Sequence, residues 1–235
     1  MEIAAESLDA SAAYRLLVGI VVPRPIAWIT TVSPAELVNA APFSCYTFVC
    51  NDPPMLAINI GRRDGELKDT ARNIDENGEF VVNVVSEDLV EAMHATSAEC
   101  DPELSEVDAL RLDLAPSRVV RTPRLARSPV SLECRLDRII ELGRFRNGLV
   151  LGRIVYLHIA NTVYDNGKID SEKLRLVARL AGRKYARLTD YLNMPPADLT
   201  RAAAHRSHKT WPNEGSPGGS TLALGARNRS GRNAS

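Results

Sequence analysis

Apolar and β-branched residues gather in short segments along the chain, and each segment follows a turn signal. The segments are 26–32, 38–49, 55–61, 79–85, 129–142 and 148–161. Few of the gaps between them hold a convincing long helix, so the pattern is not a regular alternation of strand and helix. We predict a mainly β fold in which one sheet closes into a barrel and the helices are peripheral.

The last two segments differ in how their two faces are composed. From 132 to 142, apolar residues alternate with charged residues such as Glu133 and Glu141, which is typical of a strand with one face in solvent. From 149 to 160 both faces are largely apolar. One face of this strand can fill the barrel, and we expect the other to pack against a second subunit, although a helix of the same chain would produce the same pattern.

Short helices are predicted around the sheet. Their spans are 69–77, 86–95, 171–180 and 184–193. Gly78 ends the first of them, Ser86 can cap the second, and Gly182 separates the last two. None of these helices is long enough to form a layer of its own.

Length and composition favour one domain with a flexible extension. The chain has 235 residues, of which 45% are hydrophobic, and this is enough for a full-sized core. We assign that domain to residues 1–200. From 201 to 235 the composition shifts to Arg, Ser, Gly, Asn and Pro, with six basic residues against the single acid Glu214. Such a segment buries too little apolar surface to offset the entropy of ordering, so we predict a disordered basic tail.

Charge and cysteine usage narrow the classes of partner. The formal net charge is zero, so there is no electrostatic reason to expect a nucleic acid. The four cysteines, Cys45, Cys50, Cys100 and Cys134, form no CxxC pair and no zinc-type spacing with histidine, and we expect free thiols and no metal. The amino terminus lacks a basic segment ahead of an apolar one, and no run approaches the roughly 18 apolar residues of a membrane span. We therefore expect a cytoplasmic protein.

Lys68, Asp69 and Thr70 stand at the start of the predicted helix 69–77. An ammonium group, a hydroxyl and unbonded amides at the positive end of a helix dipole suit a phosphate group. The alternative interpretation is that Asp69 is an ordinary N-cap and Lys68 a solvated charge.

Thr30 and Thr31 are adjacent in a predicted strand, so they must point to opposite faces. Alternation places Thr30 with Trp28 and Thr31 with Ile29. At most one of the two hydroxyls can therefore point into a common site. Both residues also favour strands, and this could be the whole reason for their presence.

Two further segments could approach a flat ligand. Arg24-Pro25 forms a bend that can present backbone to the edge of a ring, although any loop entering a strand could contain it. The segment Asn39–Tyr46 (NAAPFSCY) has small side chains that allow close approach to the backbone, and Ser44 offers a hydroxyl donor. A bulged or edge strand would have the same composition.

His158 lies in an apolar strand beside Ile154 and Tyr156, where a histidine is either a core or interface group or a proton donor. The chain has no GxGxxG after a strand and no GxxxxGK[ST] loop, and the two glycines of 61–65 have the wrong spacing for either. A nicotinamide would have to bind without a Rossmann unit.

These segments, taken in order, resemble the flavin reductase-like family of FMN-binding split-barrel proteins. The matching segments are Arg24–Thr31 (RPIAWITT), Asn39–Ser44 (NAAPFS), Lys68–Asn73 (KDTARN), Ser128–Cys134 (SPVSLEC) and Gly152–Ile159 (GRIVYLHI). The resemblance spans roughly residues 14–192. It implies a six-stranded split β-barrel of Greek-key type, a homodimer, and FMN held near the dimer interface.

The resemblance also implies roles for individual residues. Thr30 or Thr31, Lys68 and Thr70 would hold the phosphate. The ribityl chain and the ring would be lined by Pro25, Ser44, Cys45 and Tyr46, and the same cofactor-binding segments contain Arg24 and Asn39. His158 resembles the family's histidine near the nicotinamide, which makes it the catalytic candidate.

By this resemblance the protein is an FMN-binding oxidoreductase. The leading hypothesis is an NAD(P)H:flavin oxidoreductase, with NADH or NADPH as co-substrate, which passes a hydride to FMN and supplies a monooxygenase or an electron-transfer protein. The alternatives are a flavoredoxin-like electron carrier, an FMN-dependent enzyme acting on a specific small molecule, and a non-enzymatic binding module.

Overall fold

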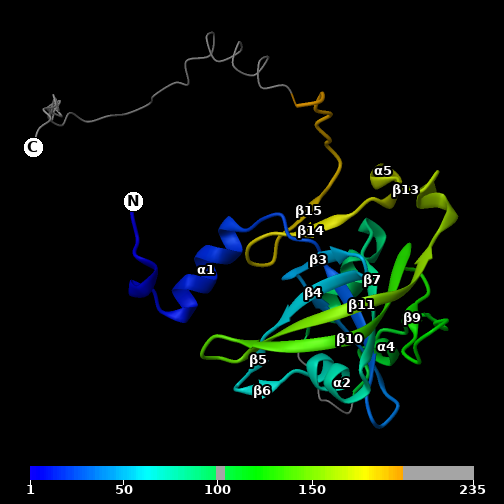
Figure 1. The fold of residues 1–235 in the computed structure, drawn as a ribbon, viewed down its shortest axis with the longest axis horizontal. Coiled ribbons are helices and arrows are strands. Elements are labelled where there is room, and N and C mark those ends of the chain that lie inside the picture. The colour runs from blue at the N-terminus through cyan, green and yellow to red at the C-terminus, as the bar shows by residue number, and fades with distance from the viewer. Residues whose placement is uncertain (99–103, 198–235) are drawn as a thin grey trace, which may run out of the picture. The chain divides into compact units, whose positions relative to one another are not determined.

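The computed structural model describes residues 1–98 and 104–197 (Figure 1). The chain divides into two compact units, Met1–Tyr191 and Leu192–Ser235. The predicted tail 201–235 and Cys100 lie outside the described residues.

A seven-stranded antiparallel sheet dominates the first unit. Its order is β2-β1-β7-β10-β11-β4-β3. The strands are β1 (Ala27–Val32), β2 (Val38–Phe43), β3 (Tyr46–Asn51), β4 (Pro54–Ile60), β7 (Glu79–Val84), β10 (Val130–Leu142) and β11 (Asn147–Ile159). All six predicted strand segments are confirmed, but the chain breaks at Ser44 and Cys45, so that 38–49 forms two strands and the sheet has seven instead of six.

The sheet encloses one apolar cluster. Residues from six of the seven strands contribute buried side chains to it, including Ile29 of β1, Ile58 of β4 and Phe80 of β7. Six strands can share one cluster only if the sheet curls around it, which confirms the mainly β barrel that the pattern predicts. The helix α2 (Asp69–Asn77) contributes Ile74 to the same cluster.

A second cluster lies on the other face of β1. Ile26 and Trp28 pack there with Met93 and Val177. Because Ala27 and Ile29 belong to the first cluster, the alternation predicted for this strand is confirmed. The two adjacent threonines of β1 therefore belong to different environments.

The long hairpin of β10 and β11 lies in the middle of the sheet, between β7 and β4 (Figure 1). Its register shifts between Glu133 and Cys134, as at a bulge. Gly152 of β11 allows Phe80 to pack closely, because a Cβ atom at Gly152 would lie 2.5 Å from Cζ of Phe80. The predicted solvent-facing role of Glu133 is wrong: its side chain is fully buried, since a loop from another part of the chain covers that face.

The helices and short strands surround the sheet. The helical elements are η1 (Ala5–Ser7), α1 (Ala10–Ile20), η2 (Glu87–Leu89), α3 (Val90–Ala95), α4 (Glu106–Ala109), η3 (Asn161–Val163) and α5 (Ser171–Leu174), in addition to α2. The short strands are β5 (Arg62–Arg63), β6 (Glu66–Leu67), β8 (Leu114–Ala115), β9 (Arg124–Leu125), β12 (Tyr164–Asp165), β13 (Lys168–Ile169), β14 (Val177–Arg179) and β15 (Tyr185–Arg187).

Two predicted helices are confirmed and two are largely wrong. The helix 69–77 ends at Gly78 in the left-handed region (φ 69°), and 86–95 is helical as η2 and α3, although Ser86 bonds the Asp88 carboxylate and caps no backbone amide. The spans 171–180 and 184–193 instead form α5 and the β14–β15 hairpin. Burial of Val177 against the second cluster outweighs local helix propensity there. The pattern also missed α1, none of whose residues is buried.

Candidate functional site

A cavity of about 230 Å³ lies where α1, the entry to β1, the end of β2 and the β14–β15 hairpin meet. Arg24, Ser44 and Cys45 line it, and all three are predicted cofactor-binding residues. The remaining lining residues are Tyr14, Val18, Ile26, Pro42, Phe43, Met93, Ser97, Arg179, Leu180, Gly182 and Tyr185. The chain thus brings the bend at 24–25 and the break at 44–45 to one hollow.

Arg24 joins the segments around this cavity. Its Nη1 donates to the carbonyl oxygens of Val18 (2.9 Å) and Val21 (2.7 Å) at the end of α1. Its Nη2 donates to the carbonyl of Leu180 (3.2 Å), and its Nε donates over a longer 3.4 Å to Oγ of Ser44. The backbone of Arg24 also exchanges two hydrogen bonds with Arg179. Arg24 therefore holds α1, the hairpin and the start of β3 together.

The hairpin contributes a second cation to the cavity. Nη2 of Arg179 donates to the carbonyl of Gly182 (2.5 Å), and its guanidinium carbon lies 4.7 Å from the centre of the Tyr185 ring. The Tyr185 hydroxyl is 3.0 Å from Nδ1 of His94. Arg179 and Tyr185 were not predicted as site residues, because the hydrophobic pattern predicts helices over 171–180 and 184–193, where the chain forms a hairpin.

At the break between β2 and β3, an exposed residue, Cys45, is followed by one that packs against the first apolar cluster, Tyr46. Cys45 is exposed, and its carbonyl accepts the amide of Asn59 (2.8 Å). Oδ1 of that Asn59 is buried and has no hydrogen-bond donor among the residues described. Tyr46 instead packs against the first cluster, where burial raises the pKa of its phenol, and Pro25 is exposed outside the cavity lining.

The second group of predicted residues lies at the start of α2. Lys68 is the N-cap residue and its side chain is exposed, and within the described ranges no side chain caps the first helical amides. The alternative in which Asp69 is the N-cap is wrong, since Asp69 lies within the first turn and pairs with Arg72 (2.8 Å). Amides without a side-chain cap next to an exposed ammonium group suit a phosphate.

A buried polar network fixes the hydroxyl groups behind Lys68. Both carboxylate oxygens of Glu106 accept from Nδ2 of Asn39 (3.0 and 2.9 Å). Oδ1 of Asn39 therefore faces the other way, where it accepts from Thr70 (3.0 Å) and Thr31 (3.4 Å), and Asn73 donates to Thr31 (3.0 Å). Thr31, Asn39 and Thr70 are thus brought together, but the hydrogen bonds of their side chains point inward.

Thr30 is not part of that network. Its hydroxyl donates to the carbonyl of Pro123 (2.7 Å) and accepts from Asn83 (3.3 Å) on the opposite face of β1. Of the two threonines, only Thr31 is therefore on the side of α2. The candidates around the cavity and those around the start of α2 lie at opposite ends of β2. Asn39 and Ser44 are separated by about 17 Å of extended strand.

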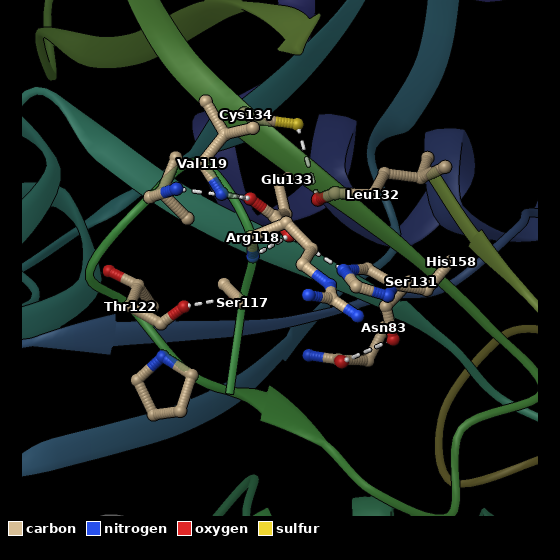
Figure 2. Close-up of polar contacts among 12 residues, drawn as sticks. Asn83, Ser117, Arg118, Val119, Thr122, Ser131, Leu132, Glu133, Cys134 and His158 are labelled. Carbon is tan, nitrogen blue, oxygen red and sulfur yellow. Dashed lines mark hydrogen bonds and ion pairs between the residues drawn. The ribbon is translucent and has the colours of Figure 1, made fainter. Parts of the chain in front are cut away.

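His158 lies apart from both groups, in a contact with Glu133 (Figure 2). Its Nε2 is 2.6 Å from Oε1 of Glu133, whose side chain is fully buried. The same carboxylate accepts the backbone amides of Arg118 (2.6 Å), Val119 (2.7 Å) and Val120 (3.0 Å).

The electrostatics of Glu133 follow from these partners. Burial works against the charged form, but the three amides and His158 outweigh it and hold the pKa of the carboxyl below its usual range. His158 does not line the cavity beside Arg24. No local signal in the sequence indicates this pair, because Glu133 and His158 meet only through the pairing of β10 with β11.

The described residues contain neither a metal-binding cluster nor a membrane-spanning helix. No cluster of three or more His, Cys, Asp or Glu side chains that could hold a metal ion occurs in 1–98 and 104–197. Over the same ranges, no helix has the length and apolar character needed to cross a membrane. Cys45, Cys50 and Cys134 are free thiols there.

Comparison with known proteins adds three similarities. Residues 19–176 match the model of the flavin reductase like domain. An uncharacterized protein of Halalkalibacterium halodurans is 46% identical over 193 residues, which cover 80% of this chain and 92% of that protein. The crystal structure of nitrilotriacetate monooxygenase component B from Bacillus cereus is 35% identical with a TM-score of 0.80, covering 83% of this chain and 98% of that one.

A further solved structure is similar over the same core. The 2-nitrobenzoate 2-nitroreductase NbaA of Pseudomonas fluorescens is 32% identical with a TM-score of 0.78, and the match covers 85% of this chain and 98% of that one. The barrel is the split-barrel type found among such structures.

Proposed function

The chain belongs to the flavin reductase-like domain family, and from that premise we propose that it is an NAD(P)H-dependent FMN reductase. A flavin-related oxidoreductase follows from the family itself. FMN as the flavin and NADH or NADPH as the donor are our proposal. The observation that supports it best is the presence of two fitting surfaces at opposite ends of β2, the cavity at Ser44 and the uncapped start of α2.

These surfaces fit the two ends of FMN. Lys68 and the first amides of α2 would hold the phosphate, with Thr31, Asn39 and Thr70 behind them. The cavity beside Arg24, Ser44 and Cys45 would take the ring, whereas Pro25 and Tyr46 lie outside its lining. When bound, the flavin supplies the redox chemistry, while the protein orients it and sets its electrostatic surroundings.

His158 remains the proton-holding candidate that the family resemblance implies, although it lies outside the lining of the cavity beside Arg24. Nε2 is occupied by Glu133, so Nδ1 is the nitrogen that is available to a ligand. The Glu133 carboxylate would keep the imidazole in one orientation.

We also propose that the active form is a homodimer with FMN near the interface. Phe48 of β3 and Leu157 of β11 are large apolar side chains that are 79% and 52% exposed in the isolated chain, and Val49 and Tyr156 beside them are exposed as well. Exposed apolar side chains of this kind are typical of surfaces that a partner covers. Sedimentation analysis of the purified protein tests this directly.

A monooxygenase is the proposed recipient of the reduced flavin. The similarity to a protein described as a monooxygenase component B supports this assignment. The similarity to a 2-nitrobenzoate nitroreductase favours a second candidate, direct reduction of a small organic acceptor by the bound flavin.

An anaerobic stopped-flow experiment tests the proposal. The FMN-reconstituted protein is mixed with NADH or NADPH while the flavin absorbance is followed. Rapid bleaching with either nucleotide supports the reductase and identifies its donor. Bound FMN that neither nucleotide bleaches would refute it in favour of an electron carrier, and failure to bind FMN would refute both.

A further inference from the structure

The cavity beside Arg24 has positive charge that no carboxylate balances. Arg24 is only 8% exposed, and every acceptor of its hydrogen bonds is neutral. Arg179, the second cation of the lining, contacts a carbonyl and the ring of Tyr185. Within the described ranges, no carboxylate pairs with either arginine or lines the cavity.

The end of α1 offsets only part of this charge. Its last carbonyls, at Val18 and Val21, accept from Arg24, and the end of a helix is equivalent to about half a negative charge. Two guanidinium groups therefore leave a clear positive excess. Nη2 of Arg24 carries two N–H groups but has one acceptor, so part of its donor capacity is available to a ligand.

The remaining walls determine the shape of the ligand. Ile26, Phe43 and Met93 are buried apolar side chains of the lining, and the volume of about 230 Å³ suits one planar ring system better than a whole dinucleotide. Apolar walls exclude water from an arginine, which strengthens its attraction for an anion.

We propose that this cavity is a binding site for a planar, delocalised anion, which Arg24 holds with support from Arg179. Two ligands share this chemistry. One is the pyrimidine edge of the FMN ring, which becomes negatively charged on reduction. This first ligand rests on the proposed function. The other is the carboxylate of a small aromatic acid.

The first ligand, FMN, is tested by measuring its dissociation constant in the oxidised and in the dithionite-reduced form, without oxygen. We expect the wild type to bind reduced FMN at least about tenfold more tightly than oxidised FMN, because the phosphate is charged in both forms but only the reduced form has an anionic ring. The ratio should fall towards one in Arg24→Gln and part of the way in Arg179→Gln. Arg183→Gln is the matched control, because Arg183 is an exposed residue of the same hairpin outside the cavity lining.

Arg24 also supports α1, so Arg179→Gln provides the test if Arg24→Gln fails to fold. The second ligand, a small aromatic acid, is tested with benzoate by measuring whether it raises the thermal unfolding temperature Tm. A benzoate-dependent rise in Tm that Arg183→Gln keeps and Arg179→Gln loses supports the anion site, even if neither form of FMN binds and the proposed function fails. Equal affinity for both forms of FMN, together with no arginine-dependent effect of benzoate, would overturn the inference.

Discussion

Replacing Glu133 by glutamine should destabilise the protein more than any other single removal of a carboxylate charge from β10. The wild-type carboxylate is fully buried and accepts four contacts, from Arg118, Val119, Val120 and His158. Glutamine has nearly the same shape, but one of its two oxygens becomes an NH₂ group, which cannot accept. At least one of the three backbone amides must therefore lose its acceptor.

The cost follows from the bonds that are lost. A buried donor left without an acceptor costs about 1–3 kcal/mol, and the remaining amides exchange a charged acceptor for a neutral one. We expect a decrease of about 2–4 kcal/mol in the free energy of unfolding. For a domain of this size that corresponds to a fall in Tm of about 5–15 °C.

Thermal and urea unfolding of Glu133→Gln, followed by circular dichroism, measure this effect. Glu141→Gln is the matched control on the same strand, because the Glu141 carboxylate pairs with Arg62 and Arg146 at the surface and its loss should leave Tm close to that of the wild type. Equal Tm values for the two variants would refute the structural role assigned to Glu133.

The pH dependence has a defined sign. The pKa of Glu133 is lower in the folded protein than its unfolded value of about 4.3, so its contribution is fully present above that value. As pH falls through the lower folded pKa, the contribution is lost. The difference in free energy of unfolding between the wild type and Glu133→Gln should therefore become smaller below about pH 4.

Three further outcomes are expected. His158→Gln should lower the free energy of unfolding by about 1 kcal/mol in urea, less than Glu133→Gln, because the three amides still satisfy the carboxylate. A larger decrease than for Glu133→Gln would contradict this prediction. Gly152→Ala should lower Tm by several degrees, because the new Cβ would lie 2.5 Å from Phe80 and overpacking of this kind costs about 1–3 kcal/mol. Adding Phe80→Leu to this variant should restore part of the lost Tm. Lys68→Met should weaken FMN binding about tenfold without changing riboflavin binding, as titration calorimetry can measure, since only FMN carries the phosphate; equal losses for both ligands would remove Lys68 from the phosphate site.

The candidate site could be predicted only where local pattern carries the chemistry. Lys68 and Thr70 could be proposed as candidates because they begin a helix, and a helix start is visible in a few consecutive residues. The orientation of Asn39 was not visible, because it depends on Glu106, which is 67 residues away in the chain. Glu133 was misassigned for the same reason, since the loop that buries it comes from residues 118–120.

The sequence by itself determined the six strand segments, the helix 69–77 and the faces of β1, because each depends on a hydrophobic pattern or a turn signal over a few positions. Only the tertiary structure decided that 171–193 contains a hairpin, that Thr31 and not Thr30 accompanies α2, and that Arg24 meets Arg179 in one cavity. The physical reason is that burial against distant segments contributes more free energy than local propensity, and those contacts exist only after the chain has folded.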